Sequence, residues 1–255
     1  RDFMFSNFGI NGHYYLSLLT THIIIYDKYN IMLQKLDTKT DSKILFDLVK
    51  HLPEGKNVLN RPTGNFFYDA WEVLPEYKGT AIEDLLKQLP DHGEARVIIM
   101  KPGESYSAHA DIDDRYHITL DAEQSFLHDI ENEMMYSTKP DNTVYLMNAG
   151  LLHSASNYGY KNRYQLVVRK RLQHNTMMND PRQVVMTSTD PVYNLRYLFD
   201  SSFSILLNKM AKEKQIDSFA RINETKIKFL CEGSKINELL KMQQICGFKI
   251  DIVYA

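Results

Sequence analysis

The chain has 255 residues, enough for one large domain or for a main domain with a smaller one beside it. It contains 44% hydrophobic and 24% charged residues, as in an ordinary globular protein, and its 16 Tyr and 12 Phe favour strands over a helical bundle. The net charge of -2 lacks the basic excess that nucleic-acid-binding proteins usually carry, so no nucleic-acid partner is expected.

The sequence also argues against a membrane or secreted protein. No apolar run approaches the roughly 20 residues of a membrane-spanning helix, since the stretch 15–26 is short and interrupted by Thr and His. No secretory signal pattern follows Arg1. Cys231 and Cys246 form no CxxC pair, which suits a reducing compartment and argues against a thiolate metal site. We therefore expect a cytoplasmic location.

Two stretches in the N-terminal region have the periodicity of amphipathic helices. Residues 42–52 and residues 80–89 each place apolar side chains three and four positions apart, and the second stretch ends before Pro90. The expected N-terminal residues are Asp41 or Ser42 for the first helix and Thr80, with Glu83 completing a capping box, for the second.

From Arg96 to Leu172 the pattern changes to short strands separated by turns. Many short strands with turn residues between them are typical of a sandwich or barrel, and a jelly roll is the natural candidate. The basic run 169–171 is expected to be a solvated strand end. The expected strands are 97–101, 106–111, 115–120, 125–130, 143–148, 151–156 and 164–170.

A polar segment, 173–182, precedes a second pattern. There a strand, a helix, two strands, a helix and a strand follow one another, which is the βαββαβ order of a ferredoxin-like module. We expect an α+β protein with a jelly-roll domain over residues 1–172, its core at about 94–172, and a small module over 180–255. The expected elements of this module are strands 183–187, 218–222, 226–231 and 248–254 and helices 192–213 and 234–245, the second ending at Gly247.

The sequence His109-Ala110-Asp111 carries the first sign of chemistry. In a strand, residues i and i+2 project from the same face, so the imidazole and the carboxylate would converge. His153, in a later expected strand, supplies a third ligand. Two His and one carboxylate leave half of an octahedral metal open, an arrangement characteristic of non-haem Fe(II) oxygenases. A zinc site would more often use three His or include Cys.

Arg163 follows His153 by ten residues, at the start of the strand YQLVVRK. A dicarboxylate such as 2-oxoglutarate would chelate the metal through its oxoacid end, and its other carboxylate needs a cation deep in the barrel. A guanidinium meets that need with two parallel hydrogen bonds. If instead the histidines are surface or core residues, the four positions share no function.

The stretches KPGESYSAHADIDDRYHITL and MNAGLLHSASNYGYKNRYQLVVR resemble the double-stranded β-helix core of 2-oxoglutarate oxygenases. Within this family they are most similar to the aspartyl/asparaginyl β-hydroxylase-like branch, which includes proline cis-4-hydroxylases. The resemblance covers roughly residues 94–172. It implies that His109, Asp111 and His153 hold Fe(II), that Arg163 binds 2-oxoglutarate, and that O2 is the oxidant, with ascorbate as an additive in vitro.

The resemblance extends to Arg115-Tyr116-His117, which matches an Arg-x-His element that helps to bind the oxoacid in this branch. His117 could alternatively pack in the sheet or act as a metal ligand, and Arg115 could pair with Asp113 or Asp114. The sequence departs from the vertebrate hydroxylases, which have Gly where this chain has Asp111. That difference favours the proline-hydroxylase-like members.

Two further residues are candidates for contacts with a substrate. Arg96 opens the strand before the Pro102-Gly103 turn and points either into the barrel mouth or to solvent. Asn157 meets a substrate or caps the turn before Gly159.

The expected function is hydroxylation of an amino acid, free and proline-like or within a peptide. The alternatives are a non-catalytic jelly-roll protein that binds a partner through its C-terminal module, and a cupin-type metal enzyme that uses no oxoglutarate. The module could also form a homodimer, and nothing in its residues decides between these partners.

Overall fold

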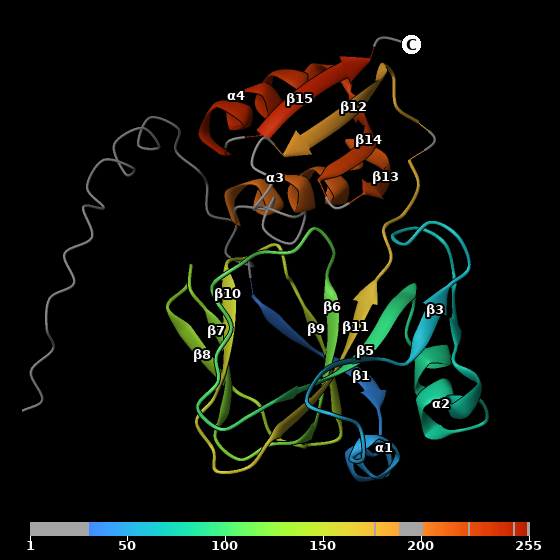
Figure 1. Ribbon diagram of the computed structural model, residues 1–255, viewed down its shortest axis with the longest axis vertical. Coiled ribbons are helices and arrows are strands. Elements are labelled where there is room, and N and C mark those ends of the chain that lie inside the picture. Colours follow the sequence, from blue (N-terminus) through green and yellow to red (C-terminus); the bar gives the residue numbers. More distant parts are fainter. Residues whose placement is uncertain (1–30, 176, 189–200, 224, 247, 254–255) are drawn as a thin grey trace, which may run out of the picture. The chain divides into compact units, whose positions relative to one another are not determined.

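The computed structural model describes residues 31–175, 177–188, 201–223, 225–246 and 248–253 (Figure 1). All of these described residues belong to one compact unit. The apolar stretch 15–26 lies outside the described residues, as does the first part of the expected helix 192–213. Among the described helices, none combines the length and the apolar composition that a membrane span needs. The division into residues 1–172 and 180–255 stays a prediction.

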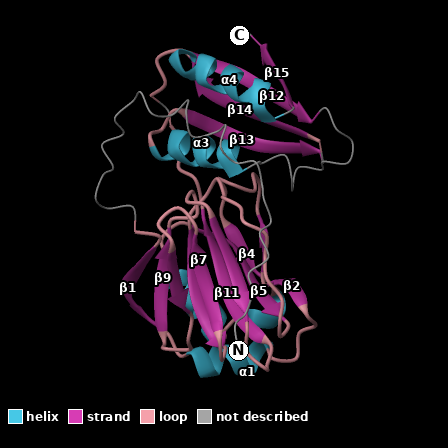
Figure 2. Cartoon of the chain, turned by 90° about the vertical axis from the view of Figure 1, so that its left-hand side faces the viewer, coloured by secondary structure: helices cyan, strands magenta, loops and turns pink. Residues whose placement is uncertain are grey.

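A six-stranded antiparallel sheet forms one wall of the core (Figures 1 and 2). Its central strands are buried on both faces, because one face lines the barrel interior and the other packs under helices. The strands, in order across the sheet, are β1 (Leu33–Lys39), β9 (Thr143–Met147), β6 (Arg115–Asp121), β11 (Arg163–Lys170), β5 (His92–Met100) and β2 (Gly55–Val58).

A second, three-stranded sheet forms the other wall, in the order β10 (His153–Asn157), β7 (Ser125–Asp129) and β8 (Met134–Ser137). Bridges Ser105↔Ser156 and His109↔His153 add the segment 105–109 beside β10. Along the chain, β5, β6, β9 and β11 of the large sheet therefore alternate with 105–109, β7–β8 and β10 of the small one. This winding between two facing sheets is that of a jelly roll, as the sequence predicted.

The expected strand 106–111 differs from the structure. Only bridge pairings occur there, and Asp111 lies in an irregular segment whose backbone N–H donates to the carbonyl of Ala149 (2.7 Å). The alternation of a regular strand is therefore not what brings His109 and Asp111 together. A backbone hydrogen bond to the turn that precedes β10 holds Asp111 instead.

Two helices cover the outer face of the large sheet. Helices α1 (Ser42–Val49) and α2 (Ala81–Gln88) bury their apolar sides against outward-facing residues of β5, β6 and β11. Asp41 caps α1, its carboxylate accepting from the backbone N–H of Ile44 (3.0 Å). The short elements nearby are β3 (Asn60–Pro62), β4 (Trp71–Val73) and the 3-10 helix η1 (Pro75–Tyr77).

The N-terminus of α2 departs from the expected capping box. The hydroxyl of Thr80 accepts from the N–H of Ile82 (3.3 Å), but the carboxylate of Glu83 accepts from the N–H of Gly79 (2.8 Å) instead of that of Thr80. The physical reason is that the Thr80 N–H already donates to the carbonyl of Tyr77 (3.3 Å).

The C-terminal elements follow the expected order of strands and helices. Their sheet is antiparallel, and Figure 2 shows the two helices beside it. The sheet order is β13 (Ile216–Asn223), β14 (Lys226–Glu232), β12 (Pro181–Ser188) and β15 (Phe248–Val253). The helices are α3 (Ser201–Lys212), α4 (Ile236–Cys246) and the 3-10 helix η2 (Gly233–Lys235).

Candidate metal centre

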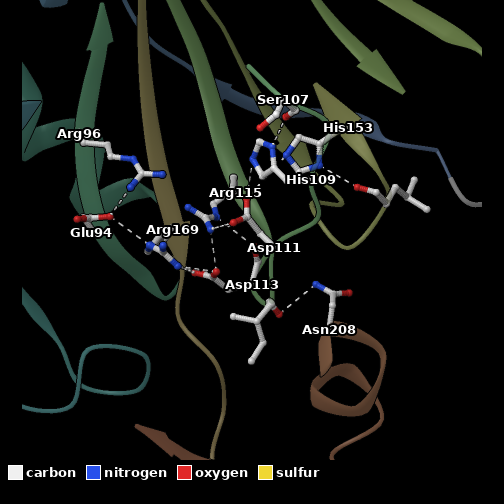
Figure 3. Close-up of polar contacts among 12 residues, drawn as sticks. Glu94, Arg96, Ser107, His109, Asp111, Asp113, Arg115, His153, Arg169 and Asn208 are labelled. Carbon is white, nitrogen blue, oxygen red and sulfur yellow. Dashed lines mark hydrogen bonds and ion pairs between the residues drawn. The ribbon is translucent and has the colours of Figure 1, made fainter. Parts of the chain in front are cut away.

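The structure brings His109, Asp111 and His153 together at one end of the jelly roll (Figure 3). One potential ligand atom from each residue lies within 4.8 Å of the other two. The Asp111 Oδ2 atom is 3.9 Å from His109 Nε2 and 3.8 Å from His153 Nε2. Two nitrogens and one oxygen therefore face a common point, as a facial metal site requires.

The hydrogen bonds of the two imidazoles fix which nitrogen is free to bind a metal. Nδ1 of His109 lies 2.9 Å from the carbonyl of Ser107, and Nδ1 of His153 lies 2.8 Å from the carbonyl of Leu151. A carbonyl only accepts, so each Nδ1 carries the proton and each Nε2 presents its lone pair to the shared point. Burial lowers the pKa of His153 to about 4, which keeps this imidazole neutral as a metal ligand must be.

Asp111 is held by a guanidinium on its other side. Arg115 Nη2 lies 2.8 Å from Asp111 Oδ1, which leaves Oδ2 toward the histidines. Burial alone would raise the pKa of Asp111, but the charges of Arg115 and Arg169 outweigh it and hold this pKa well below its usual range. The carboxylate is therefore ionised and presents a single oxygen.

Arg115 belongs to a chain of alternating buried charges (Figure 3). It also contacts Asp113 (3.0 Å), which accepts from Arg169 Nη1 (2.7 Å), and Arg169 in turn contacts Glu94 (3.1 Å). In the interior the network neutralises itself, because each guanidinium lies between carboxylates. The sequence did not reveal this network, since Glu94 and Arg169 carry no spacing signal.

The expectation that 169–171 is a solvated strand end is wrong. Arg169 lies on the same face of β11 as Arg163 and Gln165, because an even number of positions separates them. Its side chain therefore points inward, and it is only 17% exposed. Its guanidinium also stacks on Phe66, 5.0 Å from the ring centroid. Arg171 donates to the carbonyls of His92 (3.1 Å) and Tyr68 (2.7 Å).

Arg163 lies deep in the barrel and is 2% exposed. Its Nη2 donates to Gln165 Oε1 (3.1 Å), and its Nε has no hydrogen-bond partner. Among the described residues, no Asp or Glu lies within ion-pair distance of it. Burial lowers its pKa to about 10, so it is still charged at neutral pH. A buried cation without a counterion fits an anionic ligand.

His117 lies on β6 within the field of both Arg163 and the metal centre. It is 8% exposed, and its Nδ1 has no hydrogen-bond partner. Burial, followed by the charges of Arg163 and Arg115, lowers its pKa well below its usual range. It lines a cavity of about 610 Å³ with Thr119 and Gln165. A neutral imidazole with a free nitrogen is thus available to a ligand in the barrel.

The other candidate residues have defined surroundings. Arg96 is 18% exposed at its side chain, contacts Glu94 (3.0 Å) and has an Nε without a hydrogen-bond partner, and burial lowers its pKa to about 10. Asn157 is fully buried. Its amide donates to the carbonyls of Met100 and Lys161. Its Oδ1 accepts from the N–H of Gly159, which favours the turn-capping interpretation.

Comparisons with known proteins leave the family open. No protein-family model and no curated protein matches the chain. Among solved structures, the capsular polysaccharide assembling protein CapF from Staphylococcus aureus is 17% identical over 34% of this chain and 27% of its own, with a TM-score of 0.27. A predicted oxalate decarboxylase from Thermotoga maritima is 16% identical over 53% of this chain and 99% of its own, with a TM-score of 0.28.

The chain thus spans about a quarter of the length of the CapF chains that it matches, 27% in the structure of CapF with an inhibitor. Similarities with TM-scores this low decide nothing about activity. The jelly-roll core and the His-Asp-His cluster, which could hold a metal ion, stand on the strand order and the geometry described above.

Proposed function

We propose that the protein is an Fe(II)- and 2-oxoglutarate-dependent oxygenase that hydroxylates an amino acid, either free and proline-like or within a peptide. The observation that carries this proposal is Arg163, a buried cation without an acidic partner among the described residues, in the same barrel interior as the His-Asp-His cluster. Binding of a metal ion alone would not explain why the Arg163 guanidinium is buried without a counterion.

The residues present fit the proposed cofactors. His109, Asp111 and His153 would hold the metal through two neutral nitrogens and one carboxylate oxygen, leaving positions open for an oxoacid and O2. Arg163 would bind the remote carboxylate of 2-oxoglutarate. When bound, the metal, the oxoacid and O2 together supply the oxidising chemistry that replaces a C–H hydrogen by hydroxyl and leaves succinate and CO2.

The protein's own side chains would then orient and shield the reactants. His117, neutral and with a free Nδ1, would donate to or accept from the oxoacid between the metal and Arg163. Arg115 would keep Asp111 bound through one oxygen, and Arg96 would offer its unpartnered Nε to an anionic group of the substrate. No side chain needs to transfer a proton, so catalysis would rest on positioning.

We also assign a ferredoxin-like fold to the C-terminal module. The chain order of its elements and the sheet order β13-β14-β12-β15, with its first and third strands central, support this assignment. The proposed substrate is a free or peptidyl amino acid. For the C-terminal module, formation of a homodimer is proposed as an alternative to recognition of another partner.

Calorimetry with Mn(II), which replaces Fe(II) without turnover, tests the oxoacid site. 2-Oxoglutarate should bind only when Mn(II) is present. With Fe(II), ascorbate and oxoglutarate, the protein should release succinate, and more of it in the presence of its substrate from a panel of free amino acids and peptides.

His153→Ala should abolish both signals, whereas His51→Ala, a change at an exposed histidine, should leave them intact. Metal binding without oxoglutarate binding would instead favour a metal-dependent jelly-roll enzyme of another kind. Binding of neither would favour a non-catalytic partner-binding protein.

A further inference from the structure

Helix α3 of the C-terminal module contacts both chain segments that carry the metal ligands. We define the ligand loops as residues 111–114, which begin at Asp111, and residues 148–150, which precede His153. The loops are already joined to each other, because the N–H of Asp111 donates to the carbonyl of Ala149 (2.7 Å). Figure 3 shows α3 approaching the first loop.

Asn208 of α3 lies against both ligand loops. Its Nδ2 donates to the carbonyl of Ile112 (3.1 Å), the residue directly after Asp111 (Figure 3). Its other side faces Gly150, where an added Cβ would come within 2.2 Å of Asn208 Oδ1. Asn208 is 4% exposed, so this amide is almost fully buried between the loops. A side chain at position 150 would therefore have to displace Asn208, whereas glycine allows the close approach of α3.

Lys212, one helical turn further along α3, repeats the pattern. Its Nζ donates to Asn148 Oδ1 (2.7 Å) and lies 3.0 Å from Asp114 Oδ1. One cation therefore joins the end of the first ligand loop to the start of the second. Residues four apart share one face of a helix, so Asn208 and Lys212 form a single contact surface.

Apolar packing adds to these polar contacts. Ile112 is 6% exposed and belongs to the same apolar cluster as Leu207 and Met210 of α3 and as Phe219 of β13. A side chain adjacent to a proposed metal ligand is thus part of the core of the C-terminal module. Ile112 directly follows Asp111 in the chain, so contacts that hold Ile112 in place also restrict the position of Asp111. This restriction matters because metal coordination tolerates displacements of only a few tenths of an ångström.

We infer that Asn208 and Lys212 are positioning residues of the metal centre and that the C-terminal module is one of its structural parts. This inference rests on the metal site of the proposed function but not on the identity of the oxoacid or the substrate. Removing these contacts should leave the three ligands in the chain but spread their positions, and so weaken metal binding.

Titration of the metal-free full-length protein with Mn(II) alone tests the inference, followed by electron paramagnetic resonance or calorimetry. Asn208→Leu, which keeps the approximate volume and removes the donor, should weaken Mn(II) binding about 10- to 100-fold, the effect typical of residues that orient metal ligands. Lys212→Met should show the lower end of that range, because its side chain is 43% exposed.

Lys209→Met is the matched control, since this lysine lies on the same helix, is 68% exposed and, among the described residues, has an ion pair only with Glu213 at 4.0 Å. It should bind Mn(II) like the wild type. The absorption bands of bound Co(II), recorded at saturation, should shift in Asn208→Leu and not in Lys209→Met. A general loss of stability would not cause such a shift.

If Asn208→Leu and Lys212→Met both fold and keep the wild-type Mn(II) affinity and Co(II) bands, the inference is overturned. If Asn208→Leu does not fold, Lys212→Met decides by the same two measurements. A wild type that binds Mn(II), variants that bind it weakly, and no response to oxoglutarate would support the inference while refuting the oxygenase. A wild type that binds no Mn(II) would overturn both.

Discussion

At the scale of single residues, the buried arginines of the barrel are of two kinds, which differ in whether a carboxylate neutralises the guanidinium. Arg115 and Arg169 lie between carboxylates and form a balanced network, whereas Arg163 faces no acid among the described residues. Burying a charge without a counterion is costly, and proteins keep such a charge where a ligand supplies the missing sign. Opposite consequences follow when the two kinds are removed.

Replacing Arg163 by Met should stabilise the ligand-free protein and abolish oxoglutarate binding. The substitution removes an uncompensated buried charge, so we expect the free energy of unfolding to rise by about 1–3 kcal/mol. Urea denaturation of metal-free protein measures this change, and calorimetry with Mn(II) measures the lost binding. Arg163→Lys, which keeps the charge, should bring no such gain. A less stable Met variant that still binds oxoglutarate would contradict the role proposed for Arg163.

Replacing Arg115 by Gln should have the reverse effect on stability. Arg115 is 2% exposed and contacts both Asp111 and Asp113. Its loss leaves the Asp111 carboxylate without this cation, while Asp113 keeps its ion pair with Arg169. We expect a loss of about 3–5 kcal/mol of unfolding free energy. Arg61→Gln, which removes an exposed pair with Glu72 at 3.4 Å, is the control and should change stability by less than about 0.5 kcal/mol. Equal effects of the two substitutions in urea would argue against a buried charge network.

At the scale of elements, local patterns predicted the helices and strands better than their side-chain contacts. Periodicity placed α1 and α2 and their N-caps, because an amphipathic helix is specified by residues close in sequence. The inward orientation of Arg169 and the irregular backbone at Asp111 depend instead on partners far along the chain, such as Asp113 and Ala149. For that reason the three proposed ligands could be selected from sequence, while the network that holds Asp111 could not.

The cap of α2 gives a test confined to one element. Thr80→Ala removes the hydroxyl that accepts from Ile82 and donates to Tyr77, so the unfolding free energy should fall by about 1 kcal/mol. Thr80→Ser keeps that hydroxyl and should be nearly neutral. Since α2 packs on the outer face of the large sheet, Mn(II) affinity should stay at its wild-type value in both variants. If Thr80→Ala and Thr80→Ser have equal denaturation midpoints, the hydroxyl of the cap does not contribute to stability.

At the scale of the whole molecule, contacts between residues far apart in the sequence join the described parts of residues 31–255. Local sequence patterns do not predict these contacts. The sequence pattern predicted that the C-terminal elements form a separate module, because the order βαββαβ corresponds to an entire ferredoxin-like fold. The hydrogen bond from Asn208 to Ile112 spans 96 positions, and an isolated Asn on a helix carries no signal of its partner. Only the folded structure therefore links the module to the metal centre.

This linkage predicts that the described core of the protein unfolds in one cooperative transition. The apolar cluster that contains Ile112 and Tyr68 also contains the core of the C-terminal sheet, so neither part can lose its packing without exposing the other. A metal that binds only the folded state should then stabilise everything at once, by about 2.7 kcal/mol at a free Mn(II) concentration 100 times its dissociation constant. Calorimetric and circular-dichroism melts should show a single transition that Mn(II) moves to higher temperature as a whole. Two transitions, of which Mn(II) shifts only one, would mean that the C-terminal module folds independently of the metal centre, because stabilisation by a ligand spreads only as far as unfolding is cooperative.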